Sequence, residues 1–155
     1  MKDEGIKVVA TNRQAGRDYL LGERLEAGLA LQGSEIKSVR AGQVSLKESF
    51  VRVAEGQAWL QDAHIAPYQP AALEGHEARR PRRLLLHRRE ILRLEAAVRQ
   101  KGMTLVPTRM YLRNGRAKLE VAVARGKRKY DKRQVLAQRE AEVEMARARG
   151  RRGQR

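Results

Sequence analysis

The sequence predicts a mainly β domain, a small antiparallel barrel with two or three helices, followed by a basic C-terminal tail. Several short segments alternate between apolar and polar residues, and only two segments have the apolar spacing of a helix. The last 30 residues, 126–155, contain 11 Lys or Arg and 4 Asp or Glu, with few and mostly small apolar residues. A segment of this kind has little to bury, so we expect it to be disordered in isolation.

The first expected strand covers residues 24–32, where every second residue from 25 to 31 is apolar. A short helix is expected at 35–41, with Ser34 as its N-cap and a glycine after its last residue. Ile36 and Val39 lie one turn apart, so we expect them to face the interior.

A hairpin and a long loop follow. Residues 50–54 and 57–63 have strand character on either side of a Glu-Gly pair at 55–56, and their aromatic residues Phe50 and Trp59 are expected in the core. Residues 66–83 are rich in Pro, Gly and Arg and predict a loop, and loops of this length are usually functional or disordered. Three leucines at 84–86 predict a short buried segment.

A second helix is expected at 87–101. Glu90 stands three residues after His87, which is the spacing of a reciprocal N-terminal cap. Ile91 and Leu94 begin an apolar face at helical spacing, and a glycine at 102 ends the pattern.

Two strands, at 106–112 and 119–123, complete the domain. The Asn-Gly pair at 114–115 is the strongest hairpin signal in the chain. Pro107 has no backbone N–H, so it predicts a sheet edge or a bulge. About six short strands with two helices fit a small barrel, and partly open barrels of five or six strands often bind nucleic acid.

Composition points to a polyanionic partner. The chain of 155 residues has a formal net charge of +16, and residues 1–125 alone carry +9. Nucleic acid is the favoured partner, although membranes and acidic proteins also attract cationic proteins. The sequence has no cysteine, its N-terminus lacks an apolar signal core, and no apolar stretch approaches the roughly 20 residues of a membrane span. We therefore expect a soluble, cytoplasmic protein that does not enter a membrane.

Enzyme motifs are not evident. The three histidines lie far apart in the sequence, so we expect no metal site and no cofactor. The sequence has no phosphate-binding Gly-rich loop and no nucleophile elbow. Glu26 and Glu35 are conceivable as a catalytic carboxylate pair, but a solvated or arginine-paired role is favoured for each. We expect a protein that is not an enzyme.

Residues 31–42, Leu-Gln-Gly-Ser-Glu-Ile-Lys-Ser-Val-Arg-Ala-Gly, resemble the signature of the SsrA-binding protein (small protein B) family. Further blocks that resemble the family, at 12–19, 26–28, 83–87 and 124–133, occur in the family's order. The similarity extends over nearly all of the chain from residue 12 to residue 133.

The resemblance implies an oligonucleotide-binding (OB) type barrel at 1–125 that binds RNA, and a tail at 126–155 that becomes helical on the ribosome. It implies binding to the tRNA-like domain of transfer-messenger RNA (tmRNA) and its delivery to stalled ribosomes for trans-translation, that is, ribosome rescue and peptide tagging. The implied partners are tmRNA, the decoding centre and message channel of the small ribosomal subunit, and, in the delivery complex, elongation factor Tu.

The family's RNA-contact positions correspond to Glu26, Leu85 and His87. A helix cap is an equal and compatible role for His87, and a core position is an equal alternative for Leu85. Basic residues are further candidates for RNA binding: Arg13, Lys37, Arg40, Arg82, Arg83 and Arg88. The candidates for the decoding centre are Lys127, Arg128, Lys129, Tyr130, Asp131, Lys132 and Arg133.

Two other functions remain open on the sequence. Another ribosome-associated barrel, such as an initiation factor or a ribosomal protein, would explain the charge and the fold but not the ordered blocks. A small nucleic-acid-processing enzyme would need a motif that the sequence does not display.

Overall fold

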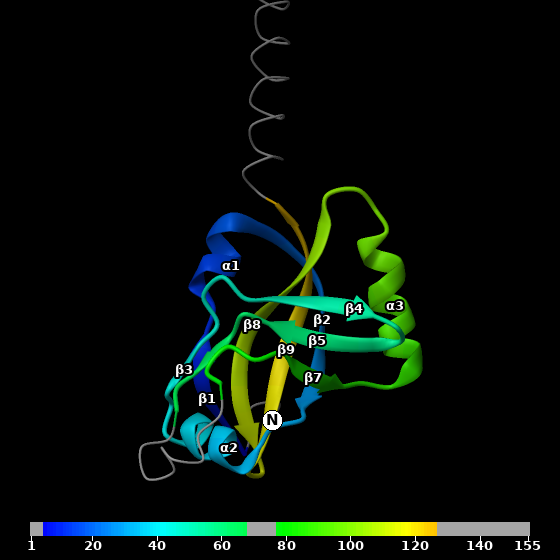
Figure 1. Cartoon of the computed structure of the whole chain (residues 1–155). Coiled ribbons are helices and arrows are strands. Elements are labelled where there is room, and N and C mark those ends of the chain that lie inside the picture. The colour runs from blue at the N-terminus through cyan, green and yellow to red at the C-terminus, as the bar shows by residue number, and fades with distance from the viewer. Residues whose placement is uncertain (1–4, 68–76, 127–155) are drawn as a thin grey trace, which may run out of the picture.

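A computed structural model describes residues 5–67 and 77–126 (Figure 1). The strands are β1 Ile6–Thr11, β2 Tyr19–Leu29, β3 Val44–Ser45, β4 Phe50–Ala54, β5 Gln57–Gln61, β6 His64–Ile65, β7 Arg82–Leu85, β8 Met103–Arg113 and β9 Arg116–Gly126. The helices are α1 Arg13–Asp18, α2 Gly33–Arg40 and α3 Arg88–Val98. The expected tail helix lies outside the described residues. The predicted fold class, mainly β with an antiparallel sheet and few helices, is confirmed.

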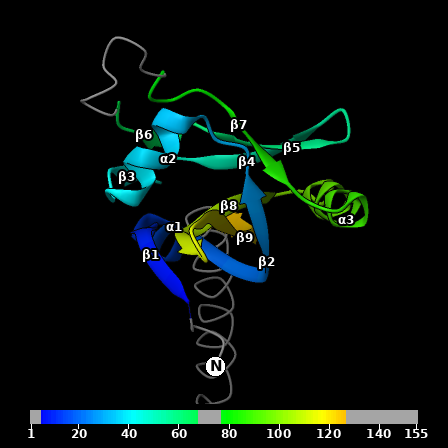
Figure 2. The same ribbon diagram turned by 90° about the horizontal axis from the view of Figure 1, so that it is seen from below.

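Antiparallel pairing connects six strands into a ring. The order is β8, β4, β5, β7, β2, β9 and back to β8. Strand β1 pairs with residues 109–113 of β8, beyond the residue that contacts β4. The contact between β4 and β8 is a single residue pair, Val51 with Leu105. Strands β4, β5 and β7 therefore form one wall, and β2, β9 and β8 form the other, as Figures 1 and 2 show.

Successive side chains of each strand point to opposite faces of the sheet, and the inward-pointing ones, which are mostly apolar, fill the space between the two walls. Leu60 on β5, Leu105 and Met110 on β8, and Leu119 and Val121 on β9 are fully buried. The helices lie outside this core, with α3 on the opposite side of the molecule from α1 and α2 (Figures 1 and 2). No helix in residues 5–67 and 77–126 is long and apolar enough to cross a membrane.

Both predicted hairpins are confirmed. Asn114 and Gly115 have φ values of 51° and 79°, which the mirror-image turn between β8 and β9 requires. The register between these strands shifts just after Pro107, so the predicted bulge is present. The carbonyl oxygen of Pro107 accepts a hydrogen bond from Asn12 Nδ2 at 2.8 Å, and the Asn12 side chain also accepts from the N–H of Ala15 in α1.

Several predicted boundaries are wrong. Strand β2 begins at residue 19 rather than 24. The loop expected to reach residue 83 ends before β7, which begins at residue 82, and α3 ends at Val98 rather than at residue 101. Ser34 is not the N-cap of α2, because the helix begins at Gly33, two residues earlier than expected, and Gln32 is the N-cap. Phe50 is not in the core, since 38% of its surface is exposed. Four elements, β1, α1, β3 and β6, were not predicted, because each is short or gains its partner only through distant contacts.

A buried ionic cluster joins α2 to β7. Glu35 and Arg82 are both fully buried, with Arg82 Nε 2.7 Å from Glu35 Oε2, and Arg80 bonds to the other carboxylate oxygen. Arg82 also donates to the carbonyl oxygens of Ala63, at 2.7 Å, and Glu77, at 3.3 Å. Burial by itself would raise the pKa of Glu35, but hydrogen bonds from Arg80, from the backbone of residue 32 and from Arg82 bring this pKa below its usual value.

Substitution Glu35→Ala should lower the free energy of unfolding by about 3–5 kcal/mol, because it leaves the Arg82 guanidinium buried without a counter-charge. Urea denaturation of the full chain measures this change. Glu95→Ala is the matched control, since it removes the partly exposed partner of Arg99, which follows the last residue of α3. This control substitution should lower the free energy of unfolding by less than about 1 kcal/mol. Equal losses in the two variants would contradict a stabilising role for the buried cluster.

The contribution of Glu35 should depend on pH. Because its folded-state pKa is lowered from the ordinary 4.5, its ionised form stabilises the fold above that value. This stabilisation is lost as the pH falls through the folded-state pKa. The difference in unfolding free energy between the natural chain and Glu35→Ala should therefore narrow below pH 4.5. A constant difference from neutral to strongly acidic pH would show that the charge of Glu35 is unimportant.

Candidate functional site

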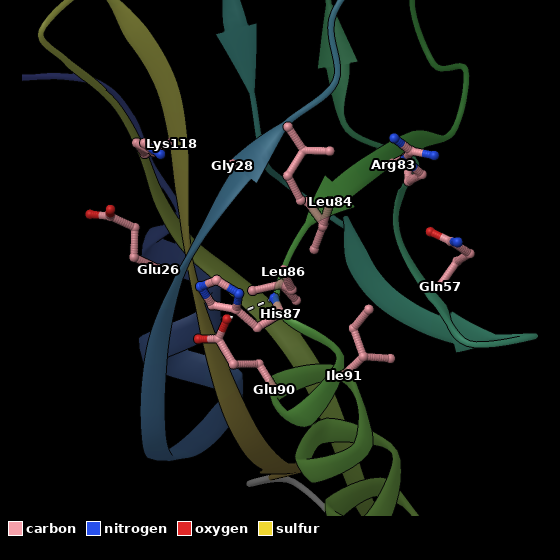
Figure 3. Close-up of a pocket in the computed structure, with 11 residues that line it drawn as sticks. Glu26, Gly28, Gln57, Arg83, Leu84, Leu86, His87, Glu90, Ile91 and Lys118 are labelled. Carbon is pink, nitrogen blue, oxygen red and sulfur yellow. Dashed lines mark hydrogen bonds between the residues drawn. The ribbon is translucent and has the colours of Figure 1, made fainter.

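A pocket of about 590 Å³ opens where β2, β7 and the start of α3 meet (Figure 3). It is lined by Glu26, Gly28, Gln57, Arg83, Leu84, Leu85, Leu86, His87, Glu90, Ile91 and Lys118. Its rim combines carboxylate, guanidinium, imidazole and ammonium groups with leucine side chains. Such a surface can accept and donate hydrogen bonds and can also contact an apolar or aromatic face.

Close approach of β2 and β7 shapes one wall of the pocket. Gly28 pairs directly with Leu85, and a Cβ atom at residue 28 would lie only 3.2 Å from the Cβ of Leu85. Glycine at this position leaves room for the leucine. Leu85 is 48% exposed, so it does not belong to the core and is available for contact.

His87 lies at the pocket and at the first turn of α3. It is the N-cap residue, and its backbone N–H donates to Glu90 Oε1 at 2.9 Å, as the dashed line in Figure 3 shows. The predicted reciprocal cap is therefore confirmed. The residue as a whole is exposed, so the capping role leaves it accessible to a partner.

Glu26 stands on the other side of β2 from His87 (Figure 3). Its Oε2 atom accepts a hydrogen bond from the Tyr111 hydroxyl and lies 3.1 Å from Arg113 Nη2. Burial raises the pKa of Tyr111 to about 12, and the bond to Glu26 adds to this rise, so the phenol remains a donor at neutral pH. Glu26 is therefore paired with an arginine, which is one of the two roles favoured from the sequence, and its side chain is partly exposed.

A row of cationic and aromatic residues continues from the pocket across the outer face of β7, β5 and β4. Arg83 pairs with Trp59, which pairs in turn with Arg52. Both arginines are exposed and Trp59 is half-buried. Arg83 belongs both to this row and to the pocket lining, so the two surfaces are continuous.

The structure brings together only part of the predicted site. Glu26, Arg83, Leu85 and His87 line the pocket, and the exposed Arg88 follows directly in the chain. The expectation for Arg82 is wrong: its side chain is fully buried against Glu35, so its guanidinium is not on a binding surface. The sequence predicts a loop at residues 66–83, but a strand starts at residue 82 and directs alternate side chains inward.

Other predicted residues lie elsewhere. Arg13 is on α1, and Lys37 and Arg40 are exposed on α2, on the opposite side of the molecule from α3 (Figure 2). The tail candidates, 127–133, lie outside the described residues. Sequence reasoning missed Lys118 and Gln57, which reach the pocket because β9 pairs with β2 and β5 pairs with β7. No local pattern in the sequence marks either residue.

The model of the SmpB protein family matches residues 9–151. The chain belongs to the SmpB family. Family relatives span almost its full length: an SsrA-binding protein of Acidothermus cellulolyticus is 52% identical over 97% of this chain and 95% of that protein. An SsrA-binding protein of a Roseiflexus species is 57% identical over 92% of this chain and 90% of that protein.

The family assignment agrees with the fold. A chain from a solved structure of tmRNA-SmpB in the bacterial ribosome is similar with a TM-score of 0.66 and 44% sequence identity. The similarity covers 79% of this chain and 85% of that chain. The resemblance found in the sequence is therefore confirmed.

The cap at the pocket edge should contribute measurably to stability. Glu90→Ala removes the acceptor for the His87 N–H and should lower the free energy of unfolding by about 1 kcal/mol. Glu90→Gln is the control, because a glutamine oxygen can accept the same bond at helix position N3. Thermal or urea unfolding measures both variants. A loss in Glu90→Gln as large as that in Glu90→Ala would contradict the cap as the cause.

Proposed function

We propose that this SmpB-family protein binds the tRNA-like domain of tmRNA and delivers it to stalled ribosomes for trans-translation. The observation that carries the proposal is the family match over residues 9–151 together with the pocket, which is lined by three of the candidate RNA-binding residues, Glu26, Leu85 and His87. Relatives with about half of their residues identical are named SsrA-binding proteins, and the similar solved structure contains tmRNA-SmpB in the bacterial ribosome.

The chemistry of the pocket suits a folded RNA. Proteins recognise folded RNA largely by shape, through phosphates, 2′-hydroxyls and exposed base edges. Arg83 and Lys118 can donate to phosphate oxygens, His87 can form a hydrogen bond or stack, and Glu26 can accept from a hydroxyl or amino group. Leu85 provides an exposed apolar contact for a ribose or a base. None of these contacts makes or breaks a covalent bond, so the proposed role is that of an adaptor rather than an enzyme.

The two parts of the chain have different tasks in this proposal. Residues 1–125 bind the tRNA-like domain. The tail, 126–155, enters the decoding centre and the message channel, where it becomes helical and supplies the signal that a codon would normally give. Lys127 to Arg133 lie at the start of this tail, where their charge suits ribosomal RNA and Tyr130 can stack on a base. Elongation factor Tu completes the delivery complex, and the process takes place in the cytoplasm.

The division of tasks predicts opposite effects for two changes. Truncation after Arg125 should leave affinity for a tRNA-like domain transcript within a few fold of that of the full chain, and should abolish peptide tagging on stalled ribosomes. Combined substitution of Glu26 and His87 by Ala should weaken RNA binding first, by at least tenfold, because two polar contacts are lost. Filter binding and a reconstituted tagging assay measure these effects.

Glu95→Ala changes a partly exposed residue further along α3, outside the pocket lining. It is the control for the double substitution and should bind normally. Affinity should also fall as the salt concentration rises, because phosphate contacts release counterions. If the truncated chain lost RNA binding and tagging equally, the two-part proposal would be refuted. Enrichment of bulk ribosomal RNA instead of tmRNA in a pull-down would favour another ribosome-associated barrel.

A further inference from the structure

The two carboxylate oxygens of Glu26 have different surroundings. Oε2 accepts from the Tyr111 hydroxyl and pairs with Arg113 at 3.1 Å. Oε1 accepts no hydrogen bond from any residue in the described ranges. The side chain of Glu26 is 37% exposed, so the free oxygen lies on a surface that a partner can reach.

The groups that hold Oε2 are themselves fixed. Tyr111 is 3% exposed, and its ring lies beneath two guanidinium groups, 5.0 Å from that of Arg109 and 5.8 Å from that of Arg113. Its strand, β8, is paired on both sides, with β1 and with β9. A phenol in such a setting keeps one position, so it holds the carboxylate bonded to it in one place as well.

We infer that Tyr111 and Arg113 are positioning residues for RNA binding, which hold Glu26 through Oε2 and leave Oε1 to accept one hydrogen bond from the RNA. The inference rests on the proposed function. Neither residue belongs to the pocket lining, and each acts through Glu26.

Two physical reasons support this arrangement. A free glutamate loses side-chain entropy when it binds, whereas a glutamate that is already held loses little, so affinity is gained through preorganisation. A carboxylate near RNA also meets phosphate repulsion, and the Arg113 charge beside it offsets this repulsion. Since Oε2 is occupied, Glu26 cannot use both oxygens to accept the paired donors of a guanine edge, and Oε1 is left to accept from a 2′-hydroxyl or a base amino group.

A double-mutant cycle on the full-length protein tests the inference, with a tRNA-like domain transcript of tmRNA as the probe. Tyr111→Phe should weaken binding by about 2- to 10-fold, the effect of one net hydrogen bond. In a Glu26→Ala background the same change should have no further effect, because no carboxylate remains to be held. An equal loss in both backgrounds, or no loss in the natural background, would overturn the inference.

Thr108→Val is the matched control. Like Tyr111→Phe it removes a hydroxyl from β8, but this hydroxyl donates to Glu120, at 2.7 Å, rather than to Glu26. The control should leave RNA affinity unchanged. A loss as large as that of Tyr111→Phe would show a general effect on the sheet and would also overturn the inference. If Glu26→Ala alone bound normally, the proposed RNA contact of Glu26 would fail, which is a separate result from a failed positioning role.

Discussion

The buried pair of Glu35 and Arg82 is the constraint on which the site depends. Arg82 sits in β7, and its guanidinium reaches the glutamate of α2 and two backbone carbonyl groups. Both charged groups are removed from water, so each is stable there only while the other is present. Their bond therefore fixes the position of a strand that is only four residues long.

Strand β7 then places the functional side chains by simple alternation. With Arg82 directed inward, Arg83 must point outward, Leu84 inward and Leu85 outward, in agreement with their burial. The chain leaves the strand directly into the cap of α3, so His87 lies beside the exposed leucine. Pairing of β7 with β2 adds Gly28, and pairing of β2 with β9 adds Lys118. A structural ion pair on one face thus organises a binding surface on the other.

The proposed RNA surface is not uniformly cationic. Glu26, which lines the pocket, is tied to Tyr111 and Arg113. Its cross-strand neighbour Glu120 lies outside the pocket lining and pairs with Arg24 and Arg109. Hydrogen bonds and nearby arginines hold the pKa of Glu120 below its usual value, although its burial acts in the opposite direction. A paired carboxylate such as Glu26 adds an acceptor to a basic surface without strong repulsion of phosphate. Net charge can thus attract RNA over a distance, while fixed polar groups discriminate among RNA shapes.

The sequence by itself determined the local features. The Asn-Gly turn, the bulge at Pro107, the cap formed by His87 and Glu90 and the mainly β class follow from residues close together in the chain, and the ordered blocks identified the family. Tertiary structure alone decided which side chains meet. Tyr111 and Glu26 are 85 residues apart, and Asn12 and Pro107 are 95 apart. The predicted surface role of Arg82 was wrong for the same reason, because its inward direction depends on Glu35, a partner 47 residues away. Strand pairing and the burial of charge depend on contacts between distant parts of the chain, so no short segment determines them.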